Sequence, residues 1–400
     1  MLASDRRARP SPAYSPQVKV DSLSEILITG TGLFTPPDSV TNAELVESLS
    51  KANERWNAEH RAQIDADEIE ERDMPSEKFI LKASGIGHRY VMDKEGVLDP
   101  ERLRPRLPTR SEDELGIQAE MCLPAIEEAL AQAGRTASDV DAVIVGCSNL
   151  QRAYPAVAIE VQQAIGAKGF AYDMNVACSS ATFALQNAVD AVRSGSARCA
   201  LVLCPEITSG HNNFELREFH FIFGDACTAV IVERAETADA SAGDGESWEI
   251  LGTKLVTRFS NNIRNDFGFL NASEETPRDP HELVFRQNGR QVFNEVCPMV
   301  AEHIATHLAE TGVPLEEVRR FWLHQANLGM NKLIAKTLLG RDPEPEESPV
   351  ILDEYANTSS AGSVIAFHKH RDGLVPGDAA VLCSFGAGYS VGSLILRRRS

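Results

Sequence analysis

The chain has 400 residues, of which 43% are hydrophobic and 24% are charged, and its formal net charge at pH 7 is −19. This length and apolar content are enough to bury a large core, as one big domain or as two fused halves. The acidic balance argues against general nucleic-acid binding, which needs clustered Lys and Arg, although a local basic patch can still attract an acidic partner. No apolar run approaches the ~20 residues that cross a bilayer, so no membrane span is expected.

The start of the chain and its cysteines indicate where the protein works. Residues 1–24 predict a flexible tail, because Met1 to Lys19 is polar and rich in Pro, Ser and Arg and lacks the apolar centre of a secretory signal. The eight cysteines are scattered without a CxxC pair. This pattern suggests no zinc site and no redox motif, and it fits a reducing cytoplasm.

The first half of the chain, residues 25–235, predicts alternating strands and helices. Apolar runs bounded by Gly indicate strands at 26–30, 140–146, 170–176, 199–204 and 226–233, and helices at 116–134, 156–165 and 179–194. Residues from about 48 to 114 interrupt this pattern with a mostly acidic, Pro-containing segment. We expect an insertion of short helices that lies on the surface or caps a cleft, with 79–89 apolar enough to pack.

The second half, residues 246–400, repeats the order after a linker expected at 235–247. Strands are expected at 248–257, 321–324, 379–385 and 391–396, and helices at 289–310, from about 327, and at 360–370. The two halves also end alike, since 223–232 parallels 385–394. Strand–helix alternation given twice predicts duplicated α/β halves with mostly parallel sheets.

Three separate residues are candidates for catalysis. Cys178 lies between a strand end and a helix start, where free N–H groups and the helix dipole favour a thiolate nucleophile. His324 ends an apolar strand, which is where α/β folds place their sites. Asn357 lies in the turn-rich segment Tyr-Ala-Asn-Thr-Ser-Ser. Taken singly, each also fits an ordinary structural role: a packed thiol, a core histidine and a turn or cap residue.

The segment Gly386-Ala387-Gly388 invites interpretation as a phosphate-binding loop. Only twelve residues follow it, too few for the helix and second strand of a dinucleotide unit. A tight turn that offers backbone N–H donors to an oxyanion is the better interpretation.

Together these residues resemble the thiolase-fold condensing enzymes, and most closely the β-ketoacyl-(acyl carrier protein) synthase III family. The resemblance runs from about Ile26 to Arg399. Its four motifs appear in order, as Val-Ala-Cys-Ser-Ser at 176–180, Phe-Gly-Asp at 223–225, His-Gln-Ala-Asn at 324–327 and Asn-Thr-Ser at 357–359. It implies two duplicated α/β halves stacked as an αβαβα sandwich, and a homodimer. Asn357 in place of a second His resembles synthase III rather than the chain-elongating synthases.

The resemblance implies a specific reaction. Cys178 would take an acyl group from acyl-CoA, and His324 and Asn357 would stabilise the enolate formed when malonyl-acyl carrier protein loses CO2. The N–H groups of Cys178 and the 386–388 turn, foremost Ala387, would hold the second oxyanion. Neither a metal nor another cofactor is implied.

Further residues acquire roles only through the resemblance. Tyr154 matches an aromatic gate on the partner subunit's acyl pocket, where relatives that join two acyl chains have a Glu base. Phe223 is assigned to the acyl pocket, and Lys332 and Arg217 to docking of the carrier protein.

The sequence also departs from the family pattern in four places. Ser180 and Ala387 replace glycines, Gly329 replaces an Arg that helps to dock the carrier, and the 48–114 insertion is absent from minimal members.

Two alternatives remain open at this point. One is an enzyme of the same fold that joins two acyl chains without malonate or only transfers acyl groups. The other is a catalytically silent scaffold, against which the complete Cys-His-Asn set argues. The acyl chain length, and whether CoA or carrier protein is the acyl donor, do not follow from the sequence.

Overall fold

The structure is a computed structural model that describes residues 25–239, 246–275 and 279–399. Its central feature is a nine-stranded sheet with the order β11-β12-β13-β8-β1-β7-β6-β4-β5. The strands are β1 (Ile26–Phe34), β4 (Ala142–Gly146), β5 (Phe170–Met174), β6 (Cys199–Glu206), β7 (Ala226–Arg234), β8 (Trp248–Thr257), β11 (Val318–Leu323), β12 (Ala379–Gly386) and β13 (Ser390–Arg398).

Helices pack on both faces of this sheet, and shorter elements surround it. The main helices are α5 (Ile117–Ala133), α6 (Val157–Ile165), α7 (Ser180–Ser194), α9 (Gly289–Thr311), α10 (Leu328–Leu339) and α12 (Ala361–Lys369). The others are α1 (Asn42–Glu59), α2 (Arg61–Asp65), α3 (Glu77–Ser84), α4 (Lys94–Leu98), α8 (Ala235–Asp239) and α11 (Leu352–Tyr355). Two small ribbons pair β2 (Asp38–Thr41) with β3 (His88–Val91), and β9 (Ile263–Arg264) with β10 (Arg286–Gln287).

The two halves of the chain repeat one strand arrangement. The neighbours β4, β6, β7 and β1 of the first half correspond to β11, β12, β13 and β8 of the second. The outer pairs, β4 with β6 and β11 with β12, are parallel. The next two pairs of each set, β6–β7 and β7–β1 in the first and β12–β13 and β13–β8 in the second, are antiparallel. The sets meet where β1 pairs with β8, and β5 extends the first set beyond β4.

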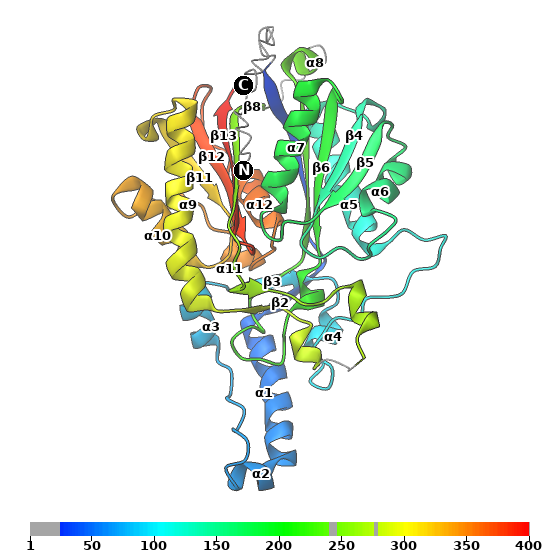
Figure 1. Cartoon of the computed structure of the whole chain (residues 1–400), viewed down its shortest axis with the longest axis vertical. Coiled ribbons are helices and arrows are strands. Elements are labelled where there is room, and N and C mark those ends of the chain that lie inside the picture. Colours follow the sequence, from blue (N-terminus) through cyan, green and yellow to red (C-terminus); the bar gives the residue numbers. More distant parts are fainter. Residues whose placement is uncertain (1–24, 240–245, 276–278, 400) are drawn as a thin grey trace, which may run out of the picture.

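The elements form the five layers that the duplicated fold predicted. These are α5 with α6, the strands of the first half, α7 with α12, the strands of the second half, and α9 with α10. Alternating strand residues divide between two sides, so that Ile144 of β4 packs with α7 and α12 whereas Val143 and Val145 pack with α5 and α6. A third core joins the second half of the sheet to α9 and α10. Figure 1 shows α7 and α12 at the centre, with α9 and α10 on one side and α5 and α6 on the other.

The prediction of mostly parallel sheets is wrong, because five of the eight pairings within the large sheet are antiparallel and three are parallel. The reason is the connections into β7 and β13. Neither is preceded by a crossover helix, and β12 turns directly into β13 at 386–390. A strand that returns without a crossover runs antiparallel to its neighbour.

Most of the predicted elements are confirmed within a few residues. The strand expected at 248–257 has those bounds, and α5, α6 and α7 each end before a left-handed glycine at Gly134, Gly166 and Gly195. No helix among the described ranges is both long and apolar enough to cross a membrane.

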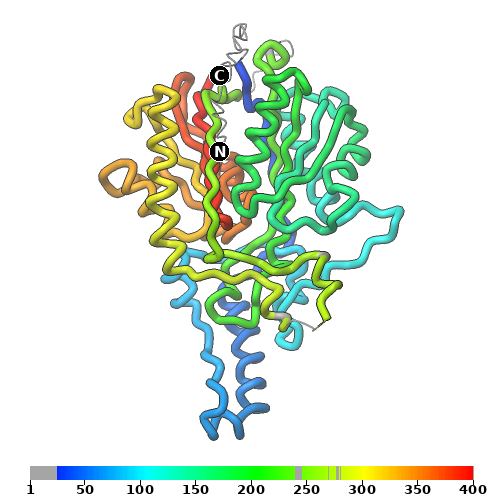
Figure 2. The backbone as a smooth tube through the Cα atoms, in the orientation of Figure 1, coloured from blue at the N-terminus to red at the C-terminus, as the bar shows by residue number. Residues whose placement is uncertain are grey.

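The segment predicted as an insertion at 48–114 differs from the expectation of short helices. Its first part belongs to α1, an 18-residue helix that already begins at Asn42, after a capping box formed by Thr41 and Glu44. Leu45 and Leu49 of α1 pack in a separate core, while the far end of the helix and α2 project away from the body (Figure 2). Its 79–89 part packs as predicted, since Ile80, Ile86 and Arg89 are buried.

The predicted linker and the predicted tail are not confirmed by the structure. The expected linker at 235–247 begins instead as the short helix α8, and residues 240–245 lie outside the described residues. The tail predicted at 1–24 also lies outside them.

Candidate active site

Cys178 lies on a tight turn between β5 and α7. The residue before it, Ala177, has a left-handed backbone with φ of 48°, which is costly for a side chain other than Gly. The Asn175 side chain accepts the Ala177 N–H at 2.9 Å and supports this turn. Ser180, one of the departures from the family pattern noted in the sequence, adds to it by accepting the Val176 N–H and donating to the Ala177 carbonyl. The departure at Ser180 thus reinforces the turn.

The second half of the chain brings His324 and Asn357 to the same cavity as Cys178. His324 follows β11 directly, and its backbone N–H donates to the Cys383 carbonyl at 2.8 Å. Asn357 is 6% exposed. Its Oδ1 accepts the backbone N–H of Ser359 at 2.9 Å, which leaves the amide nitrogen as the donor for a ligand.

Ser359 is a site residue to which the sequence interpretation gave no role. Its Oγ donates to Cys178 Sγ at 3.5 Å, within the range for a sulfur acceptor. Its backbone is left-handed, with φ of 49°, as is that of Ala356 at 56°. The Asn-Thr-Ser motif contained the residue, but only the folded turn shows that its hydroxyl reaches the thiol.

The turn at 386–388 lies against Cys178. A Cβ atom on Gly386 would lie 2.7 Å from Cys178 Cβ, so only glycine fits there. Ala387 lines a cavity together with Cys178, whereas Gly388 lines neither of the cavities that Cys178 lines. The structure therefore brings two of the three predicted turn residues to the site.

Two cavities meet at Cys178. The first chamber, of about 280 Å³, contains His324, Asn357 and Gly386 and is otherwise mostly apolar. The second chamber, of about 740 Å³, contains Ala387, Ser359 and the loop 148–153. Phe223, Ile263 and Phe285 line both chambers together with Cys178. A thioester carbonyl on the His324 side and an acyl chain on the other side can thus reach the sulfur at the same time.

Burial favours the neutral forms of Cys178 and His324. Withdrawal from water raises the pKa of Cys178 to about 11, and the charge of Glu206 adds to this, although the Ser359 hydroxyl works in the opposite direction. Withdrawal from water also lowers the pKa of His324 to about 3. Both shifts favour the neutral forms, whereas the sequence predicted a thiolate at the start of a helix; α7 begins only at Ser180, two residues beyond the thiol.

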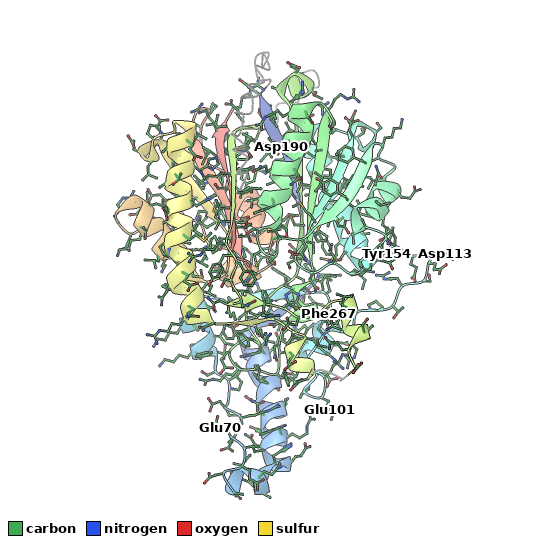
Figure 3. The ribbon with its side chains drawn as sticks, in the orientation of Figure 1. Glu70, Glu101, Asp113, Tyr154, Asp190 and Phe267 are labelled. Carbon is green, nitrogen blue, oxygen red and sulfur yellow. The ribbon has the colours of Figure 1, made fainter. Side chains whose placement is uncertain are left out.

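The remaining predicted residues lie in different places. Phe223 is buried and stacks edge-to-face on Phe285, with ring centroids 4.7 Å apart. Tyr154 is 84% exposed and lies at the margin of the molecule in Figure 3. Lys332 is exposed on α10, whereas Arg217 is bound to Asp73 at 2.8 Å.

These features define a condensing enzyme of the thiolase-like fold. The family model of the 3-oxoacyl-[acyl-carrier-protein] synthase III C terminal matches residues 308–398, and the model of 3-oxoacyl-[acyl-carrier-protein] synthase III matches 172–254. The chain belongs to this synthase III family.

Individual relatives agree. The chain is 57% identical over 353 residues to a beta-ketodecanoyl-[acyl-carrier-protein] synthase of Pseudomonas aeruginosa, covering 88% of this chain and 100% of the relative. It is 32% identical over 337 residues to a synthase III of Granulibacter bethesdensis, covering 84% and 94%. The crystal structure of the synthase III from Aquifex aeolicus matches with a TM-score of 0.70 and 25% identity, covering 93% and 99%.

The raised pKa of Cys178 predicts how its reactivity depends on pH. Below a pKa of about 11, the thiolate fraction grows about tenfold per pH unit. Alkylation of Cys178 by iodoacetamide should therefore become about a hundredfold faster between pH 7 and pH 9. Mass mapping of the modified peptide measures this site alone, and the other seven cysteines are buried. A rate that levels off below pH 8 would show that the thiolate is stabilised instead.

Proposed function

We propose that Cys178 accepts an acyl group from acyl-CoA and passes it to malonyl-acyl carrier protein with loss of CO2, giving a β-ketoacyl-carrier protein. The observation that carries this proposal is the meeting of Cys178, His324 and Asn357 in one chamber. No step of this chemistry calls for a metal or a redox cofactor.

The first half-reaction is acyl transfer. The Cys178 sulfur attacks the thioester carbonyl, the bond to the CoA sulfur breaks, and the proton of the Cys178 thiol leaves with the CoA thiol. The backbone N–H groups of Cys178 and Ala387 are the proposed donors to the oxyanion. Because Ala387 and Cys178 face the second chamber, we place the acyl chain there.

The second half-reaction breaks and makes a carbon–carbon bond. The malonyl carboxylate leaves as CO2, and its electron pair forms an enolate whose oxygen is held by His324 and the Asn357 amide. The enolate carbon attacks the acyl carbonyl, and Cys178 departs as a thiolate that regains a proton. A neutral His324 suits this role, because at pH 7 it presents a hydrogen-bond donor without a charge.

Substitution of the three residues separates the half-reactions. We expect Cys178→Ala to abolish acylation, and His324→Ala and Asn357→Ala to keep acylation but lose at least 10²-fold in CO2 release. Intact mass after incubation with acyl-CoA, followed by malonyl-carrier protein, measures both steps. Acylation that persists in Cys178→Ala would exclude it as the nucleophile. Discharge by a second acyl thioester without CO2 would favour the acyl–acyl condensing alternative.

The name of the P. aeruginosa relative suggests the length of the primer, which is the acyl group that Cys178 accepts. A β-ketodecanoyl product has ten carbons, of which malonyl supplies two after loss of CO2, so the primer has eight. We propose a primer of about this length, with its chain in the second chamber.

The preference of the enzyme for acyl-CoA chain length should change when the second chamber is narrowed, and not when the first chamber is narrowed. Ala153 lines it and is exposed, so Ala153→Trp narrows the chamber without disturbing the core. We expect the preferred acyl-CoA to become shorter in a panel from two to sixteen carbons. The matched control is Ala83→Trp, at the exposed rim of the first chamber, which should slow all chain lengths alike. A shift in preference caused by Ala83→Trp and not by Ala153→Trp would reverse the two assignments.

The carrier protein is proposed to dock at the rim of the first chamber. Exposed cations from three elements lie beside it: Lys82 adjoins Ala83, Arg290 adjoins Gly289, and Lys332 lies one turn beyond Leu328, which packs on Gly85 at the end of α3. The ion pairs of the described residues involve none of these three cations. Arg217 is less suitable than expected, because it binds Asp73 and stacks on Phe79.

Charge reversal tests this docking surface. Lys82→Glu combined with Arg290→Glu should raise KM for malonyl-carrier protein about tenfold or more, and the effect should shrink as salt is raised. Self-acylation by acyl-CoA should change less, because it does not need the carrier. Lys51→Glu, on the exposed side of α1, is the control. An equal loss in the control would assign the effect to net charge rather than to the rim.

We further propose a homodimer that works in the cytoplasm. Strand β5 is an edge strand with exposed Phe170, and Tyr154 and Ile159 are exposed near the same end of the sheet. Pairing of β5 with its copy would cover this edge and bring Tyr154 toward the partner. All eight cysteines are free, which supports a reducing compartment.

A further inference from the structure

A carboxylate lies buried beneath the active site. Glu206, the last residue of β6, has no exposed surface, and no cation bonds to it among the described residues. Its Oε1 accepts from the Ser148 N–H, the Ser360 N–H and the Ser360 hydroxyl, and its Oε2 accepts from the Ser148 hydroxyl and the Cys147 thiol. Burial raises the pKa of Glu206, and the hydrogen bonds from Ser148 and Ser360 work against that rise because they replace water as donors to the carboxylate.

Through Ser360, Glu206 holds the Asn357 turn. Ser360 directly follows Ser359, which donates its N–H to Asn357 Oδ1 and its hydroxyl to Cys178 Sγ. This turn contains two left-handed residues, Ala356 and Ser359. Such backbone conformations persist when the surroundings over-determine them. Two hydrogen bonds from Ser360 to a fixed carboxylate provide that constraint.

Through Ser148, the same carboxylate also holds the Cys178 turn. The Ser148 carbonyl accepts from the Asn175 side chain at 3.0 Å, and that side chain accepts the N–H of the left-handed Ala177. One carboxylate therefore ties together the strained turns of both halves of the chain, one with the nucleophile and one with the enolate donor.

We propose that Glu206 is a positioning residue that fixes the position of the Asn357 amide relative to the Cys178 sulfur for the condensation step. This inference rests on the proposed function. Glu206 contacts neither reacting group and holds the two turns through Ser148 and Ser360. When ionised, Glu206 also raises the pKa of the Cys178 thiol through its charge.

A merely structural carboxylate would change stability alone, so the test uses two substitutions with different consequences. Glu206→Leu removes every acceptor, and decarboxylation by pre-acylated enzyme should fall at least tenfold in kcat with little change in KM. Glu206→Gln retains an oxygen at Oε1 and should recover most of that kcat. It also removes the charge, so alkylation of Cys178 should shift to lower pH.

Glu233 supplies the matched control, because it is equally buried on β7 but is bound to Arg135 and Thr29. Glu233→Leu and Glu233→Gln should lower stability without changing the decarboxylation kcat or the alkylation profile. If Glu206→Leu does not fold, Ser360→Ala replaces it and should lower kcat with an unchanged alkylation profile.

Two results would overturn the inference: Glu206 variants that match their Glu233 counterparts in both measurements, or a Ser360→Ala variant with normal kcat. Failure of the proposed function has a different signature, because the unmodified enzyme would then not become acylated or would not release CO2.

Discussion

The pairing of β1 with β8 is the contact on which the rest of the molecule depends. It joins two four-strand sets through only two residue pairs, Leu27 with Glu249 and Ile28 with Trp248. Trp248 is buried against Trp322 and Phe367 of the same half, and it belongs to the core cluster that contains residues of both halves. Because this junction sets one half against the other, the turn before α7 meets the turn before α12. Neither half alone holds a complete site.

At that meeting point, geometry contributes more than the reactivity of any single group. Burial disfavours the charged forms of both Cys178 and His324, so it favours a protonated thiol and a neutral imidazole. A resting thiol is less exposed to oxidation than a thiolate. In the proposed reaction, acyl transfer then depends on backbone N–H donors to the oxyanion that are already in place. This placement restricts the backbone: position 386 accepts only glycine, and Ala177 and Ser359 adopt left-handed conformations.

Much of the fold and the site was predictable because it depends on local pattern. The strand at 248–257 and the helices that end at Gly134 and Gly195 are marked by apolar runs and terminal glycines. The meeting of Cys178, His324 and Asn357 followed from recognised motifs rather than from periodicity. Their assigned roles remain proposals that the substitution experiments address.

What the sequence did not predict depends on distant contacts. The antiparallel course of β7 and β13 follows from connections whose path is not encoded by strand pattern. The pairing of Arg217 with Asp73 joins residues 144 apart in the chain. The protonation of Cys178 reflects burial by both halves, and the function of Glu206 as a hub appears only when Ser148 and Ser360 converge on it. No one-dimensional motif contains such information.

The unequal length of the two strand sets has a consequence for how copies of the molecule associate. β5 has no counterpart beyond β11 among the described residues, and the outer side of β11 is partly occupied where the Phe321 N–H donates to the Glu347 carbonyl at 2.7 Å. Growth of the sheet from copy to copy is therefore favoured at one end only. An association that joins two β5 edges about a two-fold axis uses up that end in both copies and leaves only the partly occupied β11 edges for a third. In the proposed homodimer, the asymmetry between otherwise duplicated halves thus works against growth into a filament.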